Sequence, residues 1–177
     1  MISEQSMTEQ TLDQFQRAAF SYFLQAVNPV NGLIADTSRE NSPASIGVVG
    51  FAFSSYPVAV ERGWMPRAVA VERALAALRF FRDSDQSGGP EATGFKGFYY
   101  HFLDMRTGAR VWRSELSIID TALLIAGALT ASKFFNASTP EETELRALVE
   151  TLVEYLRVFR HVGFFRFSTW FTTRDSR

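Results

Sequence analysis

The sequence predicts an all-α protein built from helical hairpins, with one short β-hairpin inside a long loop. Apolar residues recur at three- and four-residue spacing in successive segments, which is the period of an amphipathic helix. Proline, glycine and capping residues separate these segments where helices start and stop. One long loop holds two β-like runs instead. The 46% apolar content of the 177 residues is enough for one buried core.

The first expected helix begins at Thr11, because Thr11 and Gln14 have the spacing of a capping box. It ends near Asn28-Pro29, since the residue before a proline is pushed out of the helical region. Asn31-Gly32 then predicts a turn. The polar residues 1–10 precede the helix and are expected to be disordered. The apolar face of the helix consists of Leu12, Phe15, Ala19, Tyr22, Phe23 and Ala26.

Two further helices are expected before the long loop. Ser42-Pro43 supplies an N-cap and a first-turn proline for an apolar stretch over Ile46–Val60. Pro57 inside this stretch predicts a kink. Pro66 opens the next helix, which ends where Asp83–Gly94 introduces serine, glycine and proline. The apolar stripe of that helix consists of Ala68, Val71, Leu75, Leu78 and Phe81.

The long loop contains the predicted β-hairpin. Tyr99–Asp104 and Ala109–Trp112 are β-like runs, and Met105–Gly108 between them suits a tight turn with Gly108 in the left-handed conformation. Alternation along the first run is expected to send two sets of side chains to opposite faces. The buried set would be Phe98, Tyr100 and Phe102, and the set facing a cleft or solvent would be Tyr99 and His101.

Two helices follow the hairpin. One runs from about Ser117 to Phe135 and is expected to be buried, because its apolar stretch is interrupted and too short to span a membrane. The last helix begins at Thr139-Pro140-Glu141-Glu142, a capping box with proline at the first helical position.

Composition and motifs exclude several function classes. The net charge of -1 draws neither nucleic acid nor anionic lipid, and the absence of cysteine removes thiolate chemistry. No phosphate loop, dinucleotide fingerprint, zinc-binding helix motif or nucleophile elbow occurs, so no cofactor or metal is expected. The first ten residues lack the features of a secretory signal. As written, the chain is expected to be cytoplasmic, and periplasmic or secreted if the start is misassigned.

Short blocks of residues follow one another in a fixed order along the chain, in a series that spans roughly Leu12 to Phe135. The blocks are Asn28-Pro29-Val30-Asn31-Gly32-Leu33, Ser45-Ile46-Gly47, Val60-Glu61-Arg62-Gly63-Trp64, Tyr100-His101-Phe102-Leu103-Asp104, Thr107-Gly108 and the run from Ser114 to Leu124. In order and spacing this series resembles the pattern of the glucoamylase-like family that includes bacterial β-1,2-glucanases.

The resemblance implies an α/α toroid, an incomplete (α/α)6 barrel, with hydrolytic chemistry at its loop-lined mouth. Residues 11–154 would be the N-terminal part of such a domain, acting on an oligo- or polysaccharide, a β-linked glucan. Residues 155–177 depart from the family pattern and are rich in arginine and phenylalanine. We interpret this tail as the result of a truncation or a changed reading frame.

Glycoside hydrolysis needs two carboxyl groups, and the chain offers candidates around the start of the fourth helix. Glu115 and Asp120 are the predicted catalytic residues, converging only if Glu115 lies in the preceding loop. Glu115 is the favoured acid and Asp120 the favoured base or sugar ligand, because a helix N-terminus stabilises a carboxylate. Each residue also has a structural interpretation. Asp120 can cap the helix, because Ser117 and Asp120 have capping-box spacing, and Glu115 can be a solvated glutamate in the first turn.

Four residues are predicted to bind the substrate: His101, Asp104, Trp112 and Arg39. Trp112 can stack on a pyranose ring, although aromatic residues are more often core. His101 lacks a nearby acid or cysteine in the sequence, so a bond to a sugar hydroxyl or a structural role suits it better than metal binding.

Two hypotheses follow. The chain is either a glycoside hydrolase domain acting on a β-linked glucan, or an inactive helical fragment that binds sugar or associates with itself through exposed apolar faces.

Overall fold

The computed structural model describes residues 4–163, with side chains described from 8 to 156. The expectation of a mostly helical chain is confirmed. The helices are α1 (Glu4–Gln25), α2 (Ile46–Glu61), α3 (Arg67–Asp83), α4 (Ile118–Phe134) and α5 (Pro140–Gly163). The short strands are β1 (Ala44–Ser45), β2 (Gly94–Phe95), β3 (Phe98–Tyr100), β4 (Phe102–Leu103) and β5 (Leu116–Ser117).

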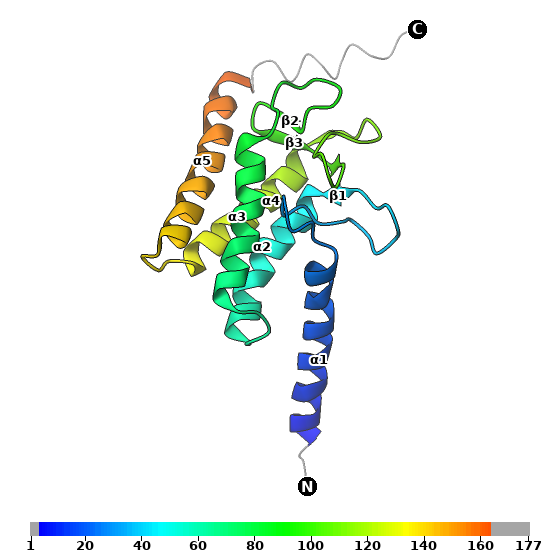
Figure 1. Cartoon of the computed structure of the whole chain (residues 1–177), viewed down its shortest axis with the longest axis vertical. Helices are drawn as coiled ribbons and strands as arrows, with labels where there is room; N and C mark the ends of the chain where they lie inside the picture. Colours follow the sequence, from blue (N-terminus) through cyan, green and yellow to red (C-terminus); the bar gives the residue numbers. More distant parts are fainter. Residues whose placement is uncertain (1–3, 164–177) are drawn as a thin grey trace.

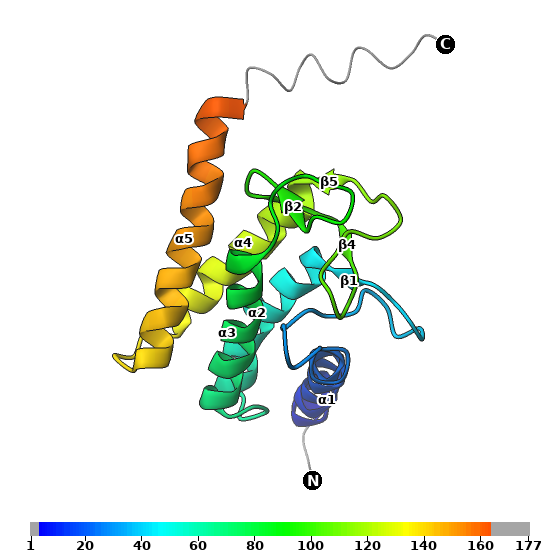
Figure 2. The same ribbon diagram turned by 45° about the horizontal axis from the view of Figure 1, so that its top comes forward.

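Helices α2 to α5 form two helical hairpins that pack side by side. Figures 1 and 2 show α2 and α4 running in one direction and α3 and α5 returning in the other. The helices α2 and α4 approach closely because Gly50 and Gly127 lie at their contact, where an added Cβ on Gly127 would overlap the Gly50 carbonyl. Parallel neighbours joined by antiparallel returns are the arrangement expected for part of an α/α toroid.

The first helix differs from its prediction at both ends. It begins at Glu4, so helical residues extend into the segment 1–10 that was expected to be disordered, and it ends at Gln25. The predicted apolar face is only partly used, since Leu12 and Phe15 are 56% and 70% exposed. The later part of the helix packs on the body, where the rings of Phe20 and Trp64 are 6.0 Å apart. Asp13, nearer its start, forms an exposed ion pair with Arg62 at 3.0 Å.

The second and third helices start differently from their predictions. Ser45, not Ser42, is the N-cap of α2, and the Ser42 hydroxyl instead accepts the Thr37 N–H within the preceding loop at 3.0 Å. Pro57 lies inside α2, as expected. Pro66 is the N-cap of α3 rather than its first helical residue. In the predicted stripe of α3, Ala68 is exposed, whereas the others, Val71, Leu75, Leu78 and Phe81, are buried.

The predicted hairpin forms only in part. Its turn is confirmed, with Gly108 at φ 72 and the Asp104 N–H donating to Ala109 O at 2.7 Å. The second run makes only an isolated bridge, Leu103 to Arg110. The first run divides into β3, which pairs with β2 and β5, and β4, which pairs with β1.

The predicted alternation of buried side chains along this run was wrong. Tyr99 and Tyr100 are both buried, at 2% and 7% exposure, whereas Phe98 and Phe102 are half-buried. The short sheet lies against helices on one side and loops on the other, so it buries both faces. Tyr99 stacks edge-on against Phe81 and donates its hydroxyl to the Phe81 carbonyl at 3.2 Å.

The last two helices begin where the sequence predicted. Ser117 caps α4, and Thr139 accepts the Glu142 N–H at 3.2 Å at the start of α5. The Glu142 carboxylate does not complete the capping box, because it binds Arg67 of α3 at 2.7 and 2.9 Å and the Ala137 N–H at 2.7 Å. This buried carboxylate ties the starts of α3 and α5 together.

The atypical tail predicted for 155–177 lies largely outside the described residues, and α5 continues through its first part to Gly163. Within residues 4–163, no helix combines the length and apolar character needed to cross a bilayer.

Candidate functional site

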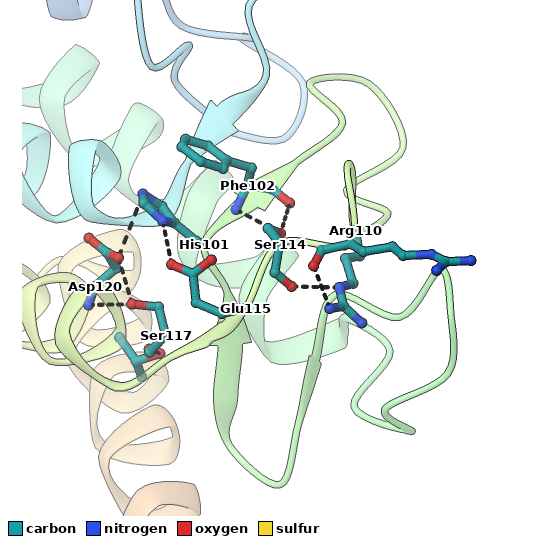
Figure 3. A network of polar contacts seen from close by, with 9 residues as sticks. His101, Phe102, Arg110, Ser114, Glu115, Ser117 and Asp120 are labelled. Atoms are coloured by element: carbon teal, nitrogen blue, oxygen red, sulfur yellow. Dashed lines mark hydrogen bonds and ion pairs between the residues drawn. The ribbon is translucent and has the colours of Figure 1, made fainter. Parts of the chain in front are cut away.

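Three titratable side chains meet at the end of the molecule where α2 and α4 begin. His101 lies in the bend between β3 and β4, Glu115 directly precedes β5, and Asp120 lies in the first turn of α4 (Figure 3). The pairing of β3 with β5 sets this meeting, because Tyr100 lies opposite Leu116. Beyond that pair the His101 N–H donates to the Glu115 carbonyl at 3.0 Å. Residues that are 14 apart in sequence are thereby brought face to face.

The His101 imidazole lies between the two carboxylates. Its Nδ1 is 2.8 Å from Glu115 Oε1, and its Nε2 is 3.7 Å from Asp120 Oδ2. The side chains of His101 and Asp120 are 27% and 19% exposed, whereas that of Glu115 is 67% exposed. The site therefore has one solvent-facing carboxylate and one recessed carboxylate, with the ring between them.

Asp120 and Ser117 form the N-terminal cap of α4, which confirms the capping interpretation of these residues. The Ser117 hydroxyl accepts the Asp120 N–H at 3.1 Å and donates to Asp120 Oδ2 at 2.6 Å. Gly47 of α2 leaves room for the carboxylate, because a Cβ there would lie 2.6 Å from Asp120 Oδ1. The cap and the close approach of Gly47 thus hold the Asp120 carboxylate in one position, with Oδ2 toward His101.

Glu115 favours its ionised form. Its own backbone N–H, the bond from His101, and the positive charge of Arg110 together lower the pKa of the Glu115 carboxyl below its ordinary value. A proton donor needs the opposite shift. The geometry therefore disfavours the role of acid that the sequence suggested for Glu115, and suits a base, a nucleophile or a ligand of sugar hydroxyls.

Among the residues that the structure describes, His101, Glu115 and Asp120 form the group that could bind a metal cation together. One ligand atom from each lies within 4.8 Å of the others. The premise that His101 has no acid nearby was wrong, because both acids reach it through the fold. Both ring nitrogens nevertheless face carboxylates as hydrogen-bond or ion-pair partners, an arrangement that needs no metal.

Asp104 has a structural role in the turn. Its Oδ1 accepts the N–H groups of Arg106 and Thr107 at 3.0 and 2.7 Å, and the Thr107 hydroxyl at 2.9 Å. These bonds, that of the Thr107 N–H first, lower the pKa of the Asp104 carboxyl. A substrate hydroxyl that bonded Asp104 Oδ1 would therefore compete with the three bonds that this oxygen accepts within the turn.

Trp112 remains a candidate sugar platform. It is 73% exposed, and its ring lies 5.6 Å from that of Phe102, which in turn stacks on His101 at 3.8 Å. Trp112 and Arg113 both have positive φ values, 54 and 53, an uncommon conformation for residues with side chains. An aromatic surface thus extends from the site toward solvent.

Arg39 is not brought into this group. It lies in the exposed loop before β1, where its carbonyl accepts the Ser42 N–H at 3.2 Å. A role in substrate binding by Arg39 stays a prediction.

Sequence reasoning missed the supporting residues Arg110, Ser114 and Gly47. The Arg110 guanidinium donates to the Ser114 and Arg113 carbonyls at 2.7 and 2.8 Å, and so stabilises the loop that leads into Glu115. The Ser114 hydroxyl bonds the backbone of Phe102. Ser114 and Gly47 fall within the recognised blocks, but neither spacing nor residue type indicates these contacts.

Comparison with known proteins agrees with the fold. No protein-family model matches the chain. The chain is 30% identical over 154 residues to an exo β-1,2-glucooligosaccharide sophorohydrolase (non-reducing end) of Parabacteroides distasonis, a match covering 81% of this chain and 20% of that protein. The chain thus spans about a fifth of the length of this curated relative.

Solved structures give the same result. A β-1,2-glucanase from Parabacteroides distasonis matches with a TM-score of 0.71 and 29% identity, covering 81% of this chain and 20% of that one. The fold of this chain is that of part of a glucoamylase-like α/α structure. A proposed glucoamylase from Bacteroides uniformis matches with a TM-score of 0.68 and 27% identity, over 77% of this chain and 33% of that one. An endo-β-1,2-glucanase from Chitinophaga pinensis, 22% identical with a TM-score of 0.70, supports the glucoamylase-like fold alone.

Proposed function

We propose that this chain carries part of the active site of a glycoside hydrolase acting on a β-linked glucan. The observation that carries the proposal is the convergence of Glu115 and Asp120 on His101, in a chain 30% identical over 154 residues to a β-1,2-glucooligosaccharide hydrolase. Two carboxyl groups are the usual requirement for cleaving a glycosidic bond.

Each residue has a distinct part in this proposal. Glu115, ionised and facing solvent, accepts a proton from a water or bonds a sugar hydroxyl. Asp120, held by Ser117, places its Oδ2 3.7 Å from His101 Nε2 on the recessed side of the site. Trp112 offers an exposed ring on which the C–H face of a pyranose can stack.

The spacing of the carboxylates limits what they can do together. The ligand oxygens of Glu115 and Asp120 lie within 4.8 Å of each other, with the His101 ring between them. An inverting hydrolase places its carboxyl groups about 6.5–9.5 Å apart to admit a water. A retaining hydrolase places them about 5–5.5 Å apart, so the spacing of Glu115 and Asp120 is nearer to that of a retaining pair. Because the pKa of the Glu115 carboxyl is lowered, the group that protonates the leaving oxygen is assigned to another residue.

Release of reducing sugar from β-1,2-gluco-oligosaccharides by the purified chain tests the proposal. Glu115→Gln and Asp120→Asn are each expected to lower the rate by about 100-fold or more, because each removes a charge used in the reaction. Glu150→Gln on the exposed side of α5 is the matched control and should leave the rate unchanged. A folded chain that releases no sugar at any enzyme concentration would count against hydrolysis.

A second function is favoured by a separate observation. Phe51 and Val58 of α2 and Ile119 and Leu129 of α4 are 42% to 75% exposed, although they are large apolar residues. Such surfaces promote association. We propose self-association as the alternative, in which the chain binds another copy of itself, with or without sugar, and does not hydrolyse a glycan.

A further inference from the structure

His101 is the most constrained side chain of the candidate site. Its N–H donates to the Glu115 carbonyl at 3.0 Å, and its carbonyl accepts the Ile46 N–H at the start of α2 at 3.3 Å. The ring stacks on Phe102 with centroids 3.8 Å apart and planes 14° apart. Backbone bonds on both sides and the stacked ring leave the imidazole little freedom to turn.

The two ring nitrogens have different partners. Nδ1 makes a hydrogen bond of 2.8 Å to Glu115, whereas Nε2 is 3.7 Å from Asp120, the distance of an ion pair. A neutral imidazole has one N–H and can donate to only one carboxylate, whereas the imidazolium has two. The ring in its charged form thus satisfies both acids at once.

We propose that His101 is a positioning residue that holds the side chains of Glu115 and Asp120 on either side of its ring, in one arrangement facing the substrate. The inference rests on the proposed function, because it assigns His101 a part in the same reaction. It differs from sugar binding by His101, since both nitrogens already face protein groups and leave no donor for a hydroxyl.

The groups around Glu115 determine whether its pKa rises or falls when His101 is replaced. Its own backbone N–H, His101 and Arg110 all favour the carboxylate, so the pKa of the Glu115 carboxyl is below its ordinary value. Burial of the Glu115 carboxyl is the influence that opposes its ionisation. A substitution that removes the His101 nitrogens removes their bond to Glu115 and leaves Arg110 in place.

Three substitutions at His101 distinguish positioning from filling space. His101→Phe keeps a ring that can stack on Phe102 but has no nitrogen. His101→Asn can place an amide N–H near the position of Nδ1 and keep the bond to Glu115. His101→Gln reaches farther, toward the position of Nε2 and Asp120.

The test measures the pH dependence of sugar release and, in the same chains, the titration of Glu115 by NMR of its carboxyl carbon. His101→Phe is expected to move both the acidic limb of the rate and the Glu115 titration upward by roughly one pH unit. In His101→Asn the acidic limb and the Glu115 titration should stay close to those of the parent chain. In His101→Gln the titration of Glu115 should shift upward as it does in His101→Phe.

Equal titration of Glu115 in the parent chain and in His101→Phe would overturn the inference, as would identical behaviour of the Asn and Phe variants. The NMR measurement needs no activity. A chain that releases no sugar yet shows the expected shift of Glu115 would therefore reject the proposed hydrolysis and support the role of His101. If His101→Phe does not fold, the comparison of Asn with Gln decides the same question.

Discussion

Asp104 stabilises the turn at Met105–Gly108, and this predicts a pH-dependent contribution to stability. The pKa of its carboxyl is lowered in the folded chain, mainly by the Thr107 N–H. The stabilisation is therefore complete above the pKa of an unfolded aspartate, about 3.9, and is lost as the pH falls through the lower folded-state pKa. Asp104→Ala is expected to lower the free energy of unfolding by about 1 kcal/mol at pH 7.

Urea unfolding at pH 7 and at pH 3 measures this effect. The difference between Asp104→Ala and the parent chain should be smaller at pH 3, where the parent has begun to lose its carboxylate. Arg106→Lys is the control, because this change keeps both the backbone N–H that bonds Asp104 and the positive charge that helps to lower its pKa. A difference that is the same at both pH values would mean that the charge of Asp104 does not support the turn.

Residue-level predictions from the sequence succeeded where partners are close in the chain. Ser117 and Asp120 lie three residues apart, so helix geometry alone brings the cap together. Glu115 and His101 are 14 residues apart, and their contact depends on the register of β3 with β5 and on a loop with two positive φ values. The sequence identified both residues, but it did not predict that they bond each other.

The contact of α2 with α4 is the feature of the helices that a single substitution tests best. An added Cβ on Gly127 would overlap the Gly50 carbonyl, and one on Gly50 would overlap the Leu123 carbonyl. Gly127→Ala forces the helices apart and is expected to destabilise the chain by about 2 kcal/mol, despite the higher helix propensity of alanine. Thr130→Ala, at an exposed position of the same helix, is the control and should change stability by less than about 0.5 kcal/mol.

Thermal unfolding followed by circular dichroism measures both variants. If Gly127→Ala is as stable as the parent chain, the two helices are not in close backbone contact there.

Capping residues and apolar spacing predicted where the helices lie in the sequence, but they did not predict which helices contact each other. The predicted ranges of α2 to α4 and the predicted start of α5 agree with the structure to within a few residues. Ser117 and Thr139 mark the starts of α4 and α5 as expected, whereas Ser42 does not cap α2. Glycine has low helix propensity, yet Gly47, Gly50 and Gly127 within the helices permit the close packing of α2 on α4. The strands have only two or three residues, too few for a pattern of alternation to identify them.

At the scale of the whole molecule, the ordered blocks predicted the glucoamylase-like fold correctly, and composition alone would not have. Apolar content does not reveal which faces stay exposed in the described part of the chain. Leu12 and Phe15 of α1 and Phe51 of α2 follow ordinary helical patterns, yet each is more than half exposed.

The exposed apolar residues of α2 and α4 predict association in solution. Phe51 and Ile119 are 52% and 75% exposed, so size-exclusion chromatography with light scattering should give a mass above that of one chain. The double substitution Phe51→Ser with Ile119→Ser should shift the mass toward the monomer, because it removes apolar area that association would bury. Val30→Ser is the control, since Val30 is 87% exposed in a loop away from both helices. A compact monomer of the parent chain at all concentrations would exclude self-association and leave sugar binding or hydrolysis as the function to test.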